Sequence, residues 1–234
     1  MHEIGKKRCT NCMISIECFK NAFEIEPTAT EHLLNLATLI GDSGEYKTAI
    51  SLFSMILEKD PLDFQAYFGR AVCYDACEMH TEALKDYDSA IKIDPNNPDL
   101  WHAKAFALQN MERFDEAVIA YQKSVSLEPE NIECRNDLGI ALLELKRIDE
   151  AKHTFEEIIQ MAPKWSEGYY SLAKVYAVEM AIDNAANYLS NAIKLDPSKE
   201  KRFLREFPKL LGSNENMMKI TDIERSKVGR KKNI

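Results

Sequence analysis

The chain has 234 residues and a formal net charge of −8, from 38 acidic and 30 basic side chains. It has no apolar run near the roughly 18 residues that a membrane-spanning helix requires, and its first twelve residues lack the apolar stretch of a signal peptide. An acidic protein repels nucleic acid and favours basic partners. We therefore expect a cytoplasmic protein that binds neither membranes nor nucleic acid.

Six of the eight prolines recur at a strict interval of 34 residues. This interval indicates a repeated supersecondary unit, because units of roughly 20–50 residues stack on their neighbours to bury their apolar faces. Proline disfavours helical geometry in the residue before it, so each one is expected to end a helix. The prolines that set the period are Pro27, Pro61, Pro95, Pro129, Pro163 and Pro197.

Small and bulky residues also recur at fixed distances from these prolines. Small residues 24 and 12 positions before a proline indicate close helix crossings, where larger side chains would overpack. Apolar spacings of three and four predict two amphipathic helices in each repeat. The small residues are Ala37, Ala71, Ala105, Gly139 and Ala173 in the first set and Ala49, Ala83, Ala117, Ala151 and Ala185 in the second. The bulky residues, eight positions before each proline, are Phe19, Phe53, Tyr87, Tyr121, Phe155 and Leu189.

On these residues the chain resembles the tetratricopeptide repeat family, whose helix–turn–helix units of 34 residues stack into a right-handed superhelix. The resemblance covers roughly residues 13–211 and implies an all-α solenoid. It also implies that every repeat begins with one helix, turns, and ends with a second helix near the proline. The full repeats are expected over residues 30–63, 64–97, 98–131, 132–165 and 166–199.

The N-terminal end departs from the repeat. Residues 1–12 form a basic leader, and residues 13–29 resemble the second helix of a repeat whose first helix is absent. This arrangement leaves one apolar face uncovered, and repeat arrays need a cap on such a face. Cys9 and Cys12 form a CxxC motif with Cys18 nearby. They are candidates for zinc or redox chemistry, but the absence of a second CxxC favours unpaired cytosolic thiols.

The C-terminal end is expected to close the stack with a capping helix over residues 200–212, which continues the register of the last repeat from Lys199. Phe203 falls at a core position, whereas Lys199 and Arg202 are expected to face outward. Pro208 should kink this helix or end it early. Residues 213–234 have no persistent apolar face and carry more basic than acidic residues, so we expect a mostly disordered basic tail.

The resemblance places ligand binding on the concave face, which the first helices of successive repeats line. Four positions in each first helix, 30, 27, 23 and 20 residues before the proline, face this groove. They form an apolar strip with carboxylates along its rim, which suits a peptide or helix with apolar anchors and basic flanks. Burial by neighbouring repeats is the alternative explanation of the apolar side chains. The candidate groove residues are Leu34, Thr38, Phe68, Val72, His102, Phe106, Asn136, Ile140 and Tyr170, with Glu31, Asp99, Glu133 and Glu167 as the rim.

The sequence contains no glycine-rich phosphate loop, HExxH or GxSxG motif. We therefore expect a non-enzymatic scaffold for protein–protein interactions that uses no cofactor and holds its partner in the groove. A second hypothesis is self-association, as a homodimer or structural element, through the uncovered N-terminal helix. A third is a metal- or redox-dependent regulator that uses the N-terminal cysteines.

Overall fold

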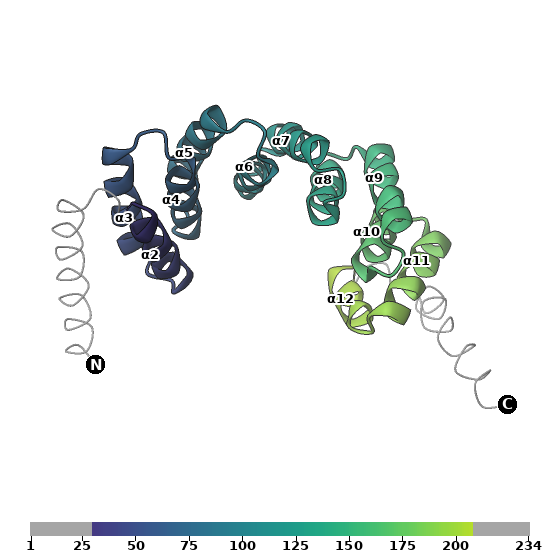
Figure 1. Cartoon of the computed structure of the whole chain (residues 1–234). Helices are drawn as coiled ribbons and strands as arrows, with labels where there is room; N and C mark the ends of the chain where they lie inside the picture. Colours follow the sequence, from purple (N-terminus) through teal and green to yellow (C-terminus); the bar gives the residue numbers. More distant parts are fainter. Residues whose placement is uncertain (1–29, 208–234) are drawn as a thin grey trace, which may run out of the picture. The chain divides into compact units, whose positions relative to one another are not determined.

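The computed structural model describes residues 30–207, and in this range the chain forms eleven α-helices and no strand (Figure 1). The predicted all-α fold of stacked helix–turn–helix units is confirmed. The leader, the N-terminal half repeat and the basic tail predicted above lie outside the described residues. The helices are α2 (Thr30–Asp42), α3 (Tyr46–Lys59), α4 (Phe64–Ala76), α5 (His80–Ile93), α6 (Pro98–Asn110), α7 (Phe114–Leu127), α8 (Ile132–Glu144), α9 (Ile148–Met161), α10 (Ser166–Val178), α11 (Ile182–Leu195) and α12 (Ser198–Glu206).

These helices belong to two compact units, with the division between Arg113 and Phe114. In the first unit α2 packs on α3 and α4 on α5, and the first helices α2, α4 and α6 contact one another in sequence. In the second unit α8 packs on α9 and α10 on α11, while α8 also contacts α10. Each unit therefore has a layer of first helices backed by second helices. None of the helices between residues 30 and 207 is long and apolar enough to span a membrane.

Three first helices begin with a side-chain cap. Asp63 accepts a hydrogen bond from the backbone N–H of Ala66 at 2.9 Å, and Asn131 caps α8 in the same way. Asn97 caps α6 through the backbone N–H two positions on, that of Asp99, at 3.1 Å. Each such cap satisfies an otherwise unpaired donor and is worth roughly 1 kcal/mol. Trp165 stands at the corresponding place before α10 and forms no side-chain cap.

The turn inside each helix pair contains one residue in the left-handed conformation. Gly44 has a φ of 87°, and the residues at successive intervals of 34 have φ values of 60°, 58°, 57° and 60°, namely Glu78, Glu112, Lys146 and Met180. A residue with a side chain adopts this conformation at a cost of roughly 1 kcal/mol, which glycine avoids. The geometry of the turn is thus constant, whereas its residue type is not.

Close approach of backbone to aromatic ring holds neighbouring helices together in both units. In the first unit, a Cβ atom on Gly69 of α4 would lie 2.4 Å from the buried ring of Phe53 in α3. In the second unit, a Cβ atom on Gly139 of α8 would lie 2.6 Å from the ring of Phe155 in α9. The sequence pattern of small and bulky residues anticipated the second contact, because both members occupy its positions.

Trp101 ties the start of α6 to the end of the preceding repeat, because its Nε1 donates a hydrogen bond to the carbonyl oxygen of Pro95 at 2.9 Å. Arg135 and Tyr169 make the same connection to the proline six residues before them, at 2.8 and 3.2 Å. These three residues occupy one position of the repeat. Their shared property is a long side chain that ends in a hydrogen-bond donor.

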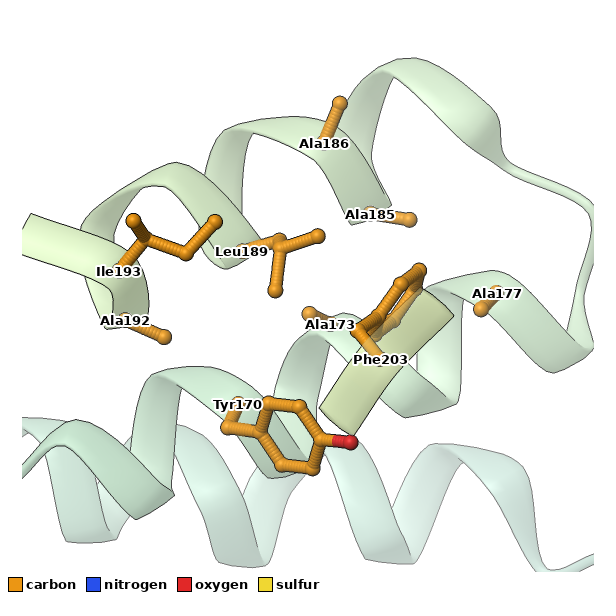
Figure 2. Packing of buried hydrophobic residues seen from close by; sticks show 9 residues of the cluster. All are labelled: Tyr170, Ala173, Ala177, Ala185, Ala186, Leu189, Ala192, Ile193 and Phe203. Atoms are coloured by element: carbon orange, nitrogen blue, oxygen red, sulfur yellow. The ribbon is translucent and has the colours of Figure 1, made fainter. Parts of the chain in front are cut away.

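Helix α12 ends at Glu206, two residues before Pro208, and it packs against α10 and α11 (Figure 2). Phe203 is fully buried. The expectation that Lys199 and Arg202 face outward is wrong, because both donate hydrogen bonds to the carboxylate of Glu167 in α10. The pattern of α12 alone could not reveal this contact, since the carboxylate comes from another helix.

Candidate functional site

The first unit presents apolar side chains on its layer of first helices. Val72 of α4 is 44% exposed and Phe106 of α6 is 50% exposed, and these residues occupy the same position of successive repeats. Burial by neighbouring helices therefore does not account for them. As exposed apolar groups at equivalent positions of α4 and α6, they are candidates for contact with another molecule.

Leu34 and Phe68, the other predicted apolar anchors of this unit, are half-buried. The ring of Phe68 lies 6.1 Å from that of Tyr87 of α5, in a tilted arrangement. Thr38 is exposed, and its hydroxyl donates a hydrogen bond to the carbonyl oxygen of Leu34 at 2.9 Å. His102 is half-buried on α6. The four predicted apolar residues of the first unit thus lie on neighbouring first helices, and Val72 and Phe106 are the most accessible of them.

A cleft of about 340 Å³ opens between α2, α3 and α4. Its lining includes Thr38, Val72 and Cys73, and Asp42 brings a carboxylate to it. The cleft lies next to the exposed side chain of Val72, so an apolar group of a partner could enter it. Sequence reasoning selected Thr38 and Val72 but not the α3 residue Tyr46, which also lines the cleft.

Negative charge surrounds this surface. Glu31 and Asp99, predicted as rim residues, are both exposed at the starts of α2 and α6. Residues 30–113 contain fourteen acidic and seven basic side chains. A partner with lysine or arginine near its apolar anchors would be attracted to this unit, and screening by salt would weaken the attraction.

Asp75, which sits deepest among the groove positions of α4, is already engaged within the unit. Its carboxylate accepts a hydrogen bond from the Tyr87 hydroxyl at 2.9 Å and lies 2.9 Å from Nδ1 of His80. Burial raises the pKa of Tyr87, and the neighbouring carboxylate of Asp75 raises it further. Asp75 therefore joins α4 to α5 rather than facing a ligand.

In the second unit, two of the predicted groove residues are buried. Asn136 of α8 is buried and accepts a hydrogen bond from the Ser171 hydroxyl of α10 at 3.0 Å. Tyr170 is fully buried. Neither side chain belongs to the open surface, because each is covered by the next helix along the stack. Ile140 is half-buried on α8.

The two acidic rim positions of this unit also differ. Glu133 is exposed and borders a cleft of about 370 Å³ that Trp165 also lines. Glu167 is half-buried and binds Lys199 and Arg202 of α12. Of these two carboxylates, only Glu133 remains on the open surface.

Two buried cysteines have chemistry suited to packing. Burial raises the pKa of the Cys73 thiol to about 11, and it raises that of Cys134 to about 11 as well. Both thiols are therefore protonated and poorly nucleophilic near neutral pH. Among residues 30–207, no group of three or more His, Cys, Asp or Glu side chains is arranged to hold a metal ion. The metal candidates Cys9, Cys12 and Cys18 lie outside the described residues.

Comparison with known proteins gives matches of one kind. Family models described as tetratricopeptide repeat match residues 64–97, 86–119 and 111–175. A search of the curated proteins finds no match.

Solved structures with the same fold include YrrB, described as "a TPR protein with an unusual peptide-binding site". It is 26% identical, with 78% of this chain and 94% of that chain covered and a TM-score of 0.66. The MamA protein is 18% identical, with 75% and 96% covered and a TM-score of 0.67. A MamA double mutant is 13% identical, with 74% and 97% covered and a TM-score of 0.67.

Proposed function

Because this chain is a tetratricopeptide repeat protein, we propose that it is a protein–protein interaction scaffold that binds a peptide or helix of its partner on the face of α2, α4 and α6. The proposal involves no catalytic step and no cofactor, and its setting is the cytoplasm. Its main support is the pair of exposed apolar side chains Val72 and Phe106 at equivalent positions of neighbouring first helices.

The partner segment is expected to carry apolar anchors with basic flanks. An aromatic or branched aliphatic anchor would cover Phe106 and Val72, and a neighbouring apolar group would enter the cleft beside Thr38. Lysine or arginine residues on either side would approach Glu31 and Asp99, which are exposed. The likeness to YrrB, whose description names a peptide-binding site, supports a peptide as the ligand class.

The second unit exposes fewer of the predicted apolar and acidic groove residues. Ile140 and Glu133 remain accessible in part, whereas Asn136 and Tyr170 are buried and Glu167 is paired. We therefore assign the main anchoring role to the first unit.

The test is binding of designed peptides to the full chain. Two helical peptides with identical aromatic anchors, one with lysine and arginine flanks and one with glutamate flanks, are titrated against the wild type and against a V72E/F106E variant. The basic peptide should bind the wild type, and the variant should weaken it at least about tenfold, because a carboxylate replaces an apolar contact at the centre of the surface.

The matched control is Leu62→Glu, which changes another exposed apolar residue of the same unit, 72% accessible in the turn between α3 and α4. This variant should bind the basic peptide like the wild type. Equal binding of the basic and the acidic peptide, or equal loss in the control, would refute the assignment of this face. Circular dichroism checks that all the variants remain helical.

A further inference from the structure

Helices α12 and α10 match each other in charge and shape along their length. Lys199 and Arg202, near the start of α12, bind the Glu167 carboxylate near the start of α10. In the middle, the ring of Phe203 meets that of Tyr170 edge-on, with centroids 6.1 Å apart (Figure 2). Along α12, the groups that contact α10 are therefore two cations, then an aromatic ring and finally the carboxylate of Glu206.

At the end of the two helices the charges are reversed, because the cation belongs to α10 and the carboxylate to α12. Lys174 of α10 lies 3.3 Å from a carboxylate oxygen of Glu206, which Arg202 of α12 also binds, at 2.9 Å. The guanidinium of Arg202 additionally lies over the Tyr170 ring, 4.6 Å from its centroid. Such alternation of charge along two helices specifies one register, because sliding α12 by a turn would bring like charges together.

The surface that receives α12 is built without α12. Tyr170 and Ala173 of α10 and Leu189 of α11 are buried in one apolar cluster, and these two helices pack directly on each other. Figure 2 shows Leu189 of α11 directed toward Ala173 of α10, with Phe203 of α12 placed beside them. Removal of α12 would therefore uncover a formed surface and leave the α10–α11 pair in place.

Helix α12 itself is weakly anchored. It has nine residues, of which only Lys199 and Phe203 are buried, whereas α10 has thirteen residues and buries seven. Isolated helices of this length are unstable in water, so α12 depends on these contacts for its structure. Its remaining contacts are ion pairs and cation–π contacts. The pair between Lys199 and Glu167 is largely buried, whereas the pair between Arg202 and Glu206 is more exposed and is therefore weaker and screened by salt.

Helix α12 covers Tyr170 but does not satisfy its hydroxyl group. The hydroxyl oxygen of Tyr170 is buried without a well-formed hydrogen bond, although the Glu206 carboxylate is near. A buried hydroxyl without a partner is destabilising, because it has lost its hydrogen bonds to water. A carboxylate placed closer to this hydroxyl than that of Glu206 would remove the penalty.

We infer that the face of α10 with Glu167, Tyr170 and Lys174 is a docking site for amphipathic helices, and that α12 is the occupant that the chain supplies for itself. The partner that fits is a helix of another protein with a lysine and an arginine three residues apart, followed at once by phenylalanine. Such a helix displaces α12. This inference goes beyond the proposed function, which uses only the face of the first unit.

The experiment uses a fluorescent synthetic peptide of residues 196–207 as the probe, titrated against the full chain by anisotropy. In the wild type the chain's own α12 competes for the site, and in a Phe203→Ala chain it loses its buried aromatic group. The peptide should therefore bind the Phe203→Ala chain at least about tenfold more tightly than the wild type, in proportion to the increased fraction of open sites.

Charge reversal identifies the site. In the Phe203→Ala background, Glu167→Arg should weaken binding of the peptide about tenfold or more, and a peptide with glutamate in place of Lys199 and Arg202 should recover it. Phe106→Glu, in the first unit, should leave binding unchanged. Failure of the proposed function is thus distinguishable from failure of this inference.

Two results would overturn the inference: no tighter binding by the Phe203→Ala chain, or binding that ignores Glu167→Arg. If Phe203→Ala lowers the helical content of the second unit, a K199A/R202A chain replaces it, because this variant keeps the aromatic contact and removes only the cations. Absence of tighter peptide binding by that folded variant would then refute the inference in the same way.

Discussion

Arg70 of α4 forms a two-pronged ion pair with Asp86 of α5, with Nε 2.6 Å from Oδ2 and Nη2 2.8 Å from Oδ1. Nη1 of the same guanidinium donates to the Ser54 hydroxyl of α3 at 2.9 Å. One side chain therefore joins three consecutive helices of the first unit. The hydrogen bond with Asp86, opposed by burial, raises the pKa of Arg70 above its ordinary value, so the guanidinium stays charged at all physiological pH values.

Asp86→Ala should destabilise the first unit by about 3 kcal/mol, because it leaves a largely buried guanidinium without its counter-ion. The control is Asp88→Ala, which removes the partner of Lys104 in the same unit. Asp88 is half exposed, so its loss should cost only about 0.5 kcal/mol. Urea unfolding followed by circular dichroism measures both costs. Equal costs for the two variants would mean that burial of the Arg70 pair is energetically unimportant.

Glycine at the left-handed turn positions should stabilise the chain. Glu78→Gly and Lys146→Gly should each gain about 0.5 kcal/mol, because relief of the left-handed strain exceeds the entropy that glycine loses on folding. The converse variant, Gly44→Ala, should lose about 1 kcal/mol even though a Cβ atom there meets nothing within 4 Å. Melting temperatures of the three variants test this. A loss of stability in both glycine variants would contradict it.

Gly139→Ala should destabilise the second unit by about 1–3 kcal/mol, because the new methyl group would overlap the Phe155 ring. Adding Phe155→Leu should recover part of this loss, since the fifth repeat pairs Ala173 with Leu189 at the equivalent positions. A double-mutant cycle of unfolding free energies measures the coupling. Simple additivity of the two changes would exclude the steric explanation.

Acid should release α12 from α10. Burial acts to raise the pKa of Glu206, but hydrogen bonds from Arg202 and Lys174 outweigh it, and the pKa lies below the ordinary value of 4.5. A carboxyl group with a depressed pKa in the folded state contributes stability that is complete above its unfolded pKa and is lost as pH falls through the folded value. The anchoring of α12 should therefore weaken progressively below about pH 4.5.

Hydrogen exchange of the amides in α12, compared with those in α11 and corrected for intrinsic rates, measures this release. Protection of α12 should fall before that of α11 as the pH is lowered. In a Glu206→Gln chain the difference between the two helices should be smaller and less dependent on pH. Loss of protection in α11 and α12 together would show that the acid effect is not specific to this contact.

The 34-residue period predicts the fold class because it records the physical demands of a helix pair. Pro95 and its equivalents end helices, and Ala37 and its equivalents allow close crossings. These demands are local, so a single sequence reveals them. The left-handed turn at Glu78 is not visible in the same way, because the turn geometry recurs while the residue that adopts it changes.

The candidate site is less accessible to sequence reasoning because exposure depends on which helix comes next. Phe68, His102, Asn136 and Tyr170 occupy one repeat position, yet only the last two are buried. Asn136 is covered because Ser171 of α10 bonds to it, and Tyr170 is covered because α12 lies on it. Position within the repeat identifies the candidates, but the neighbouring helices decide which ones a partner can reach.

The ties from Trp101, Arg135 and Tyr169 to the preceding proline carbonyls also have a mechanical consequence. Each tie bridges the joint between one repeat and the next, so a stretching force along the chain loads it directly. Trp101 and Tyr169 carry that load through stiff rings. Arg135 carries it through a flexible chain that is also attached to Glu157, at 2.7 Å, and we expect its joint to extend furthest before it breaks. We therefore expect the resistance of each of these joints to stretching to depend in part on the residue at this one repeat position.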